Sequence, residues 1–327
     1  MGKLLLAPME GLADFVLRDV LTRVGGYDGA VTEFVRVSGN LLPPRTFQRI
    51  CPELANHSRT SAGTPVAVQL LGSDPQCLAD NAAQLCALNP AGVDLNFGCP
   101  APTVNLHGGG AMLLADPERL FRIAEAVRQS VPAHIPFTAK MRLGVDDKAR
   151  ALDCALALES GGVVALVVHA RTRAEGYKPP AHWEWVARIQ DVVQLPVTAN
   201  GEVWTPDDYV RCRAVSGCED VMIGRGAVAD PFLARRIRML VGGDEPGLDR
   251  AADWLELLPS IADFWRLIQV KVAAHHAPGR LKLWLNSLRL TFVEAEALYM
   301  AVRPLRSSEE ITRVLALHGV PVLRAAA

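Results

Sequence analysis

Short apolar segments alternate with helix-length segments over the first three quarters of the chain, and this alternation is the strongest constraint on its fold. Eight segments have the length and the β-branched, apolar composition of buried strands: 3–9, 29–35, 65–72, 92–98, 136–143, 163–170, 195–201 and 220–225. Successive β–α units form a parallel sheet. Eight of them predict closure into an α/β (β/α)8 barrel, or TIM barrel, rather than an open doubly wound sheet.

The remainder of the chain has a different pattern. Residues 241–250, VGGDEPGLDR, are rich in turn-forming residues and predict a linker. Beyond them the sequence has helical periodicity and no strand candidate, with apolar residues recurring at Trp254, Leu257, Leu258, Ile261, Trp265 and Ile268. We therefore expect two domains, a barrel over 1–243 and a small helical bundle over 244–327.

Composition excludes several classes of protein. Half of the 327 residues are hydrophobic, but no apolar run approaches the roughly 18 residues that span a bilayer, so we expect a cytoplasmic protein without a membrane segment. The seven cysteines form no C-x-x-C pair, which argues against a disulfide framework and a structural metal site. The net charge of −1 argues against a chain that binds nucleic acid over its whole surface. Any nucleic-acid site must be local, and we expect a monomer.

Polar residues close most of the expected strands. In a TIM barrel the C-terminal ends of the strands meet at one mouth, where the active site lies. The side chains expected there are Pro8, Met9, Glu10, Gln69, Asn96, Cys99, Lys140, Arg142, His169, Arg171, Asn200 and Glu202. Their convergence predicts an active site rather than a surface that only binds.

Glycines follow the seventh and eighth expected strands, in Asn200-Gly201-Glu202 and Gly224-Arg225-Gly226. Barrels often bind a phosphate with these two loops, because glycine exposes backbone N–H groups. The pattern predicts a phosphorylated cofactor, although glycine at a strand end can also be only a turn.

Two side chains near the expected mouth have marked chemistry. Lys140 lies within an apolar strand, with Arg142 on the same face, and burial of a lone lysine favours an anionic partner. The alternative is that Lys140 points outward to a helix carboxylate. Cys99 follows the fourth strand and, with a thiol pKa near 8.5, could serve as a general acid. The alternative for Cys99 is a buried structural cysteine in a turn.

Nine short motifs together resemble the tRNA-dihydrouridine synthases. In chain order they are LLAPMEG at 5–11, VTEFVRV at 31–37, VQLLG at 68–72, VDLNFGCP at 93–100, GGGAMLL at 108–114, KMRLG at 140–144, HARTR at 169–173, ANGE at 199–202 and MIGRG at 222–226. The segments EFVRV, ICPEL and RLKLWL resemble the C-type bacterial subfamily in particular.

The resemblance implies a flavoenzyme in which NADPH reduces FMN, hydride passes to C6 of a tRNA uracil, and Cys99 protonates C5. It implies FMN contacts from Pro8, Met9, Glu10, Gln69, Lys140, His169, Asn200, Gly201, Glu202, Gly224 and Arg225. It also implies that Asn96 and Arg142 hold the uridine, that Arg36 faces the RNA, and that the target is position 16 of the D-loop.

The helical region carries a modest excess of positive charge. Residues 250–327 hold ten Lys or Arg and seven Asp or Glu. We expect Lys271, Arg280, Lys282 and Arg289 to contact tRNA phosphates, although a solvated helix face has the same pattern. Two other functions stay open: an FMN barrel that reduces a small free pyrimidine, similar to dihydroorotate dehydrogenase, and a non-catalytic RNA-binding module.

Overall fold

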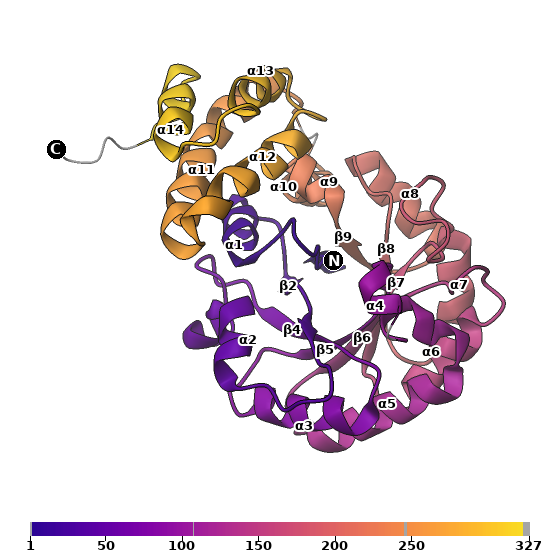
Figure 1. Cartoon of the computed structure of the whole chain (residues 1–327). Helices are drawn as coiled ribbons and strands as arrows, with labels where there is room; N and C mark the ends of the chain where they lie inside the picture. The colour runs from indigo at the N-terminus through magenta and orange to yellow at the C-terminus, as the bar shows by residue number, and fades with distance from the viewer. Residues whose placement is uncertain (1, 107, 245–246, 323–327) are drawn as a thin grey trace. The chain divides into compact units, whose positions relative to one another are not determined.

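The computed structural model describes residues 2–106, 108–244 and 247–322, and in these residues nine parallel strands form one sheet. The strands are β1 (Leu4–Leu6), β2 (Gly29–Val31), β3 (Val35–Arg36), β4 (Val66–Leu71), β5 (Val93–Phe97), β6 (Phe137–Arg142), β7 (Ala165–His169), β8 (Val197–Asn200) and β9 (Asp220–Ile223). Their order is β2-β1-β9-β8-β7-β6-β5-β4-β3, and pairing of β2 with β4 closes the ring (Figure 1). The predicted TIM barrel is confirmed.

The prediction of one continuous strand over residues 29–35 is wrong. The structure divides it into β2 and β3, both of which pair with β4. Between them Thr32 still donates its N–H to the carbonyl of Ala67 at 3.0 Å, while its hydroxyl accepts the N–H of Gln69 at 3.1 Å. The Thr32 side chain thus takes a place in the ladder that a backbone carbonyl would otherwise hold.

Helices surround the strands of the barrel (Figure 1). They are α2 (Pro44–Ile50), α3 (Pro75–Cys86), α4 (Pro102–Asn105), α5 (Pro117–Ser130), α6 (Ala151–Ser160), α7 (Trp183–Val192) and α8 (Pro206–Ser216), with 3-10 turns at Pro52–Asn56 and Gly110–Ala115. Thr205 caps α8 in a reciprocal capping box with Asp208, and Pro206 occupies the first turn, as the sequence predicts.

The chain forms two compact units. The barrel unit comprises Met1–Glu10 and Tyr27–Gly224, and the helical unit comprises Gly11–Gly26 and Arg225–Ala327. Helices of the helical unit are α1 (Phe15–Val24), α9 (Arg225–Ala229), α10 (Leu233–Gly242), α11 (Arg250–Lys271), α12 (Ala277–Leu288), α13 (Val293–Val302) and α14 (Ser308–Leu317), with a 3-10 turn at Ala274–His276. The functional boundary at 243/244 stays a prediction.

The core of the helical unit follows the predicted apolar stripe. All six apolar residues of α11 named above are buried, and so are Leu281, Trp284, Leu285 and Leu288 of α12. Phe264 packs edge-on against Trp284 with ring centroids 4.8 Å apart. A buried ion network, which the sequence does not indicate, joins Asp230 to Arg236 and Arg250.

The sequence predicts no membrane-spanning segment. Over the described residues, no helix has both the length and the apolar character that crossing a bilayer requires.

Candidate active site

The interior of the barrel contains a small apolar cluster and a set of connected polar side chains, which we call the polar side. Ala7, Val167 and Met222 form a buried apolar cluster, against which Leu5 and Val31 pack. Strands β4, β5 and β6 instead contribute polar side chains that contact one another: Gln69, Asp94, Asn96 and Thr138. Alternate residues of a strand share a face, so Lys140 lies on the same face of β6 as Thr138. This polar side is formed by β4, β5 and β6, and other buried polar residues, His169, Thr198 and Asn200, lie on β7 and β8.

Four side chains on this polar side form a continuous chain of hydrogen bonds. The Thr138 hydroxyl donates to Asp94 Oδ1 and Gln69 Nε2 donates to Asp94 Oδ2, both at 2.6 Å. Asn96 Nδ2 donates to Gln69 Oε1, also at 2.6 Å. Asn96 Oδ1 then accepts the backbone N–H groups of Gly98 at 2.9 Å and Cys99 at 2.8 Å. The chain ends at the loop that carries the predicted acid.

Lys140 lies beside this chain of hydrogen bonds. It is opposite Asn96 in the register of β5 and β6. Burial and the nearby charge of Arg142 lower the pKa of Lys140 to about 7, against the opposing effect of Asp94. Among the described residues, Lys140 Nζ has no hydrogen-bond or ion-pair partner within the chain. The outward orientation toward a helix carboxylate is therefore wrong, and the site fits an anionic ligand.

Cys99 is buried, with 9% of its surface exposed. Burial raises the pKa of its thiol, with a further contribution from Glu10, against the lowering effects of a hydrogen bond with the backbone of Ala101 and of nearby arginines. Its carbonyl accepts the N–H of Ala111 at 3.1 Å. Gly110, at φ +59°, lies so close that a Cβ there would be 2.8 Å from the Cys99 oxygen. The loop therefore holds Cys99 as a protonated thiol at neutral pH, the form that a general acid needs.

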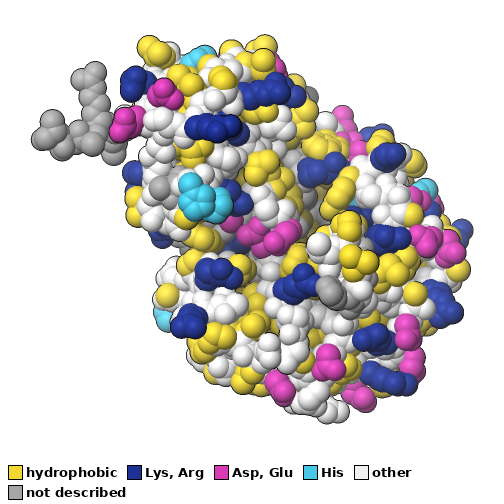
Figure 2. Space-filling model, in the orientation of Figure 1, with side chains coloured by type: hydrophobic (Ala, Val, Ile, Leu, Met, Phe, Trp, Pro, Cys, Tyr) yellow, Lys and Arg dark blue, Asp and Glu magenta, His cyan; other side chains and the backbone are white. Residues whose placement is uncertain are grey.

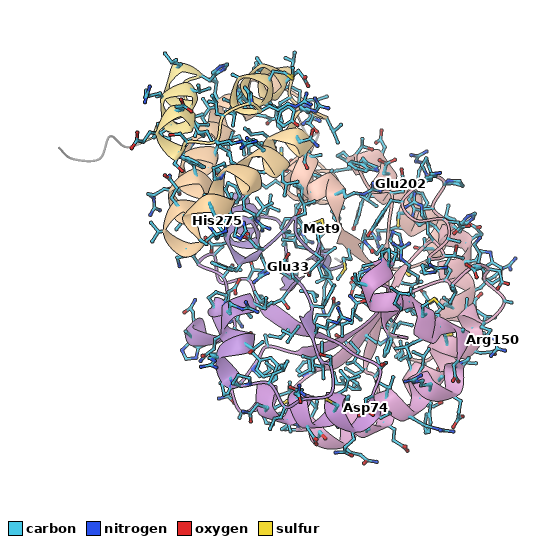
Figure 3. All side chains as sticks on the ribbon, in the orientation of Figure 1. Met9, Glu33, Asp74, Arg150, Glu202 and His275 are labelled. Carbon is cyan, nitrogen blue, oxygen red and sulfur yellow. The ribbon has the colours of Figure 1, made fainter. Side chains whose placement is uncertain are left out.

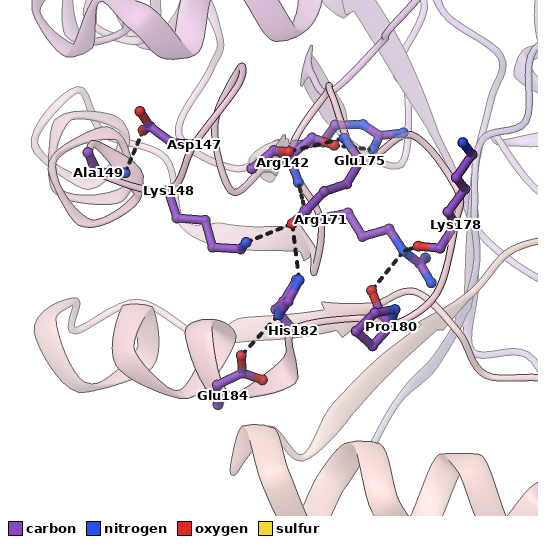
Figure 4. A network of polar contacts seen from close by, with 11 residues as sticks. Arg142, Asp147, Lys148, Ala149, Arg171, Glu175, Lys178, Pro180, His182 and Glu184 are labelled. Atoms are coloured by element: carbon purple, nitrogen blue, oxygen red, sulfur yellow. Dashed lines mark hydrogen bonds and ion pairs between the residues drawn. The ribbon is translucent and has the colours of Figure 1, made fainter.

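Arg142 joins the Cys99 loop to the loop after β7. Its Nε donates to the carbonyl of Gly98 at 2.8 Å, and its Nη1 donates to the carbonyls of Thr172 at 3.0 Å and Gly176 at 2.8 Å (Figure 4 shows the side chain). The guanidinium also lies over the ring of Tyr177, 5.0 Å from its centroid. Arg142 is thus a clamp between two mouth loops, and its contact with a uridine stays a prediction.

Glu175 organises the loop after β7, and nothing in the sequence singles it out. Its carboxylate accepts from Lys148 Nζ at 2.7 Å, from the Thr172 N–H at 2.6 Å, and lies 3.1 Å from His182 Nε2 (Figure 4). Burial raises its pKa, but the hydrogen bonds from Lys148 and Thr172 and the charges of Lys148 and His182 outweigh burial and lower the pKa to about 2. The loop that holds Arg142 is thereby anchored by an ionised carboxylate.

We expect the stability of the protein to depend on this carboxylate in acid. A pKa lowered from 4.5 to about 2 adds stability that is present above pH 4.5 and is lost as the pH falls toward 2. Allowing for the partial exposure of Glu175, the loss is on the order of 2 kcal/mol. Urea unfolding between pH 3 and 6 should show a steeper acid decline for the wild type than for Glu175→Gln. Equal declines for the two proteins would contradict the assignment.

The loop after β8 holds the predicted glycine and carboxylate. Gly201 has φ +116°, and a Cβ there would lie 3.3 Å from the ring of His169, so both its conformation and the close approach require glycine. Glu202, labelled in Figure 3, pairs with the buried Arg171 and accepts from Trp204 Nε1 at 3.3 Å. The carboxylate is thus already engaged within the chain.

The remaining predicted cofactor residues of the barrel unit lie at strand ends of the same mouth. Asn200 Nδ2 donates to the carbonyl of Met222 at 2.9 Å, and a Cβ at Gly224 would lie 3.8 Å from Ala7 and 3.9 Å from Met9. Pro8 and Glu10 follow β1, and Arg225 begins α9 in the helical unit. A lysine without a partner on β6, together with glycines after β8 and β9, fits a phosphorylated, anionic cofactor.

Most of the predicted RNA-contact residues have partners within their own unit. Arg36 donates to the carbonyl of Thr103 at 3.2 Å. In the helical unit Arg280 pairs with Asp14 at 2.6 Å, Arg289 pairs with Glu296 at 3.1 Å, and Lys282 donates to the carbonyl of Leu305. Lys271, at the end of α11, is exposed and has no such partner among the described residues. On the face shown in Figure 2, Lys and Arg are spread among acidic and apolar side chains.

Comparison with known proteins agrees with the barrel and the motifs. The family model "Dihydrouridine synthase" matches residues 5–257. A tRNA-dihydrouridine(16) synthase of Ralstonia nicotianae is 60% identical over 315 residues, covering 96% of this chain and 95% of the relative. Proteins of the same name from Aquipseudomonas alcaligenes and Neisseria meningitidis are 59% and 49% identical, covering 95% and 96% of this chain and 98% and 93% of theirs.

A solved structure adds information on the fold alone. A complex of 2-naphthoyl-CoA reductase aligns with a TM-score of 0.55 and 12% sequence identity, covering 74% of this chain and 50% of that chain. The full-length similarity to the curated relatives and the family match are far more specific. The chain belongs to the dihydrouridine synthase family.

Proposed function

We propose that this chain reduces the C5–C6 double bond of a uridine in the D-loop of tRNA, with bound FMN and with NADPH as the source of electrons. The observation that carries the proposal is that Asn96 lies between two reactive groups of the barrel mouth: it is opposite the unpartnered Lys140 in the strand register and accepts the N–H of the buried Cys99 at 2.8 Å. The names of the relatives support tRNA as the substrate and position 16 as the target.

The chain's own residues would hold the cofactor and move one proton. Lys140, Gln69, His169, Asn200 and the glycines of the last two strand ends would bind FMN, which when bound supplies hydride to C6 of the uracil. The Cys99 thiol gives its proton to C5, so that the uracil gains one hydride and one proton, and the thiolate regains its proton from water. Asn96 and Arg142 both contact the Cys99 loop and would hold the uracil edge.

The tRNA must present its base outside the stack. Enzymes that act on a base extrude it into a pocket at the cost of unstacking energy, so contacts to the rest of the RNA must supply binding energy. We propose that exposed cations of the helical unit, with Arg36, contribute such contacts to tRNA phosphates. A protein that reduces a free pyrimidine has no need of them.

Mapping dihydrouridine in a strain that lacks all its dihydrouridine synthases tests the function. Expression of this chain should restore dihydrouridine at position 16, and purified protein should consume NADPH in the presence of unmodified tRNA. Product at position 17 or 20 only would contradict the proposed target. Turnover of a free pyrimidine without turnover of tRNA would favour the dihydroorotate dehydrogenase-like alternative.

Lys271→Glu tests the RNA surface without breaking a contact inside the protein. If Lys271 neutralises one phosphate, the slope of log affinity against log salt should fall in magnitude by about 1 or less. Reduction of the flavin by NADPH should be unchanged. Arg122→Glu, an equal charge reversal on the exposed face of α5, is the control and should leave tRNA affinity nearly unaltered. If Lys271→Glu and Arg122→Glu weaken tRNA binding equally, the contact does not exist.

A further inference from the structure

Asp94 is a buried carboxylate to which the proposed mechanism gives no role. Only 1% of its surface is exposed, and both oxygens accept hydrogen bonds, from Thr138 and from Gln69. Burial raises the pKa of Asp94, against the hydrogen bonds from Thr138 and Gln69 and the charge of Lys140. The oxygen that faces Gln69 accepts from Nε2, whereas a side-chain amide has one end that accepts and one that donates. The contact with Asp94 therefore decides which end of Gln69 faces which neighbour.

The orientation of Gln69 in turn decides the orientation of Asn96. With Gln69 Nε2 directed at Asp94, Oε1 faces Asn96 and accepts from its Nδ2 at 2.6 Å. Asn96 must then direct Oδ1 at the loop, where it accepts from Gly98 and Cys99. Were the two amides reversed, the Nδ2 group of Asn96 would face two N–H donors and both bonds to the loop would be lost.

We propose that Asp94 is a positioning residue, which fixes the direction of the hydrogen-bond chain Asp94–Gln69–Asn96 and so the position of the Cys99 loop. Asp94 touches neither the thiol nor the position proposed for the uracil. It acts through two amides, and this role rests on the proposed function only for the chemistry assigned to Cys99.

The chain of hydrogen bonds can be reversed in a defined way. Asn96→Asp leaves an oxygen for the loop but sets a second oxygen against Gln69 Oε1. Adding Asp94→Asn supplies an amide donor to Gln69 at the other end, so that Gln69 turns round and donates to the new carboxylate at position 96. Both side-chain bonds of Gln69 are then restored with opposite direction, and the total charge is that of the wild type.

The rate of alkylation of Cys99 by iodoacetamide in FMN-free apoprotein, resolved from the other thiols by peptide mass spectrometry, reports on the loop without requiring tRNA or the cofactor. We expect Asn96→Asp to change this rate about tenfold and the double variant Asp94→Asn/Asn96→Asp to return it to within about threefold of the wild type. Single-turnover dihydrouridine formation by prereduced enzyme should fall in the single variant and recover in the double variant.

Two further variants complete the test. Thr138→Val removes the other hydrogen bond to Asp94 but leaves the bonds from Asp94 through Gln69 to Asn96 in place, so its Cys99 alkylation rate should match that of the wild type. Gln69→Leu interrupts the chain while Asp94 remains, so it should alter the alkylation rate as Asn96→Asp does, even if the Asp94 variants fold poorly. An unchanged rate in Gln69→Leu, or no recovery in the double variant, would overturn the proposal. If Cys99 of all variants is alkylated as expected but the wild-type protein forms no dihydrouridine in tRNA, the proposed function is refuted while the positioning role of Asp94 stands.

Discussion

Replacement of Cys99 by alanine is expected to leave reduction of the flavin by NADPH intact and to slow dihydrouridine formation by about 10²- to 10⁴-fold. Hydride addition at C6 of the uracil leaves negative charge on C5 and O4, and this anion is quenched only when a proton arrives at C5. Burial raises the pKa of the Cys99 thiol, so the proton is present across the neutral range. Rapid-mixing measurements of flavin reduction and of its reoxidation by tRNA separate the two half-reactions.

Cys154→Ala is the matched control for this experiment. Cys154 is also buried, its Sγ donates to the carbonyl of Leu114 at 3.3 Å, and burial raises its pKa to about 12, but it lies in α6 outside the barrel mouth. Its removal should leave both half-reactions near the wild-type rates. Full tRNA turnover by Cys99→Ala would exclude Cys99 as the acid, and equal losses in the two variants would indicate damage to folding.

Strand positions could be predicted from the sequence because buried parallel strands are short and apolar on both faces. Segment 136–143 contains β6, and segment 92–98 contains β5, each within a few residues of the observed ends. The break between β2 and β3 could not be predicted, because it depends on the Thr32 hydroxyl meeting the backbone of β4 across the sheet. Such pairing has no signal in the local composition.

The site could be predicted where a residue type is unusual for its place. Lys140 in an apolar strand and Cys99 after a strand are of this kind, and the structure brings both to the polar side of the barrel. The sequence does not single out Asp94 and Glu175, because each acts through hydrogen bonds with residues that are distant in sequence, such as Gln69 and Lys148. Acidic residues are common in every chain, and only the fold distinguishes these two.

For the cations of the helical unit, the sequence does not reveal which side chains are already paired within the protein. Helical spacing is enough to place Lys282 and Arg289 away from the buried residues of α12. It cannot predict that Arg289 is paired with Glu296 of α13 or that Lys282 caps the carbonyl of Leu305. A cation on a polar helix face is free to bind RNA only if no neighbouring element forms an ion pair or hydrogen bond with it. Which elements are its neighbours depends on tertiary packing.

Lys140→Met should weaken FMN binding by about 10- to 150-fold, which corresponds to the loss of one hydrogen bond between charged groups. Methionine keeps most of the volume of lysine and removes its charge, so the packing around β5 and β6 is retained. Fluorescence titration of apoprotein with FMN measures the affinity, and stopped-flow absorbance measures reduction by NADPH. Lys140→Arg keeps the charge and should retain much of the affinity. A methionine variant that binds and reduces FMN as the wild type does would exclude Lys140 as the cation.

The same substitution has a second consequence, which does not depend on the cofactor. The pKa of Lys140 is lowered from 10.5 to about 7 in the folded protein, chiefly by burial, so between these pH values the unfolded chain binds a proton that the folded chain does not. The stability of wild-type apoprotein should therefore rise as the pH increases from about 7 to 10, and the apoprotein of Lys140→Met should lack this component. Urea unfolding of the two apoproteins at pH 7, 8.5 and 10 measures the difference. Parallel curves would show that Lys140 has the same pKa in the folded and unfolded chains and would contradict its burial without a partner, whereas a lysine buried ready for an anion makes folding less favourable until the anion binds.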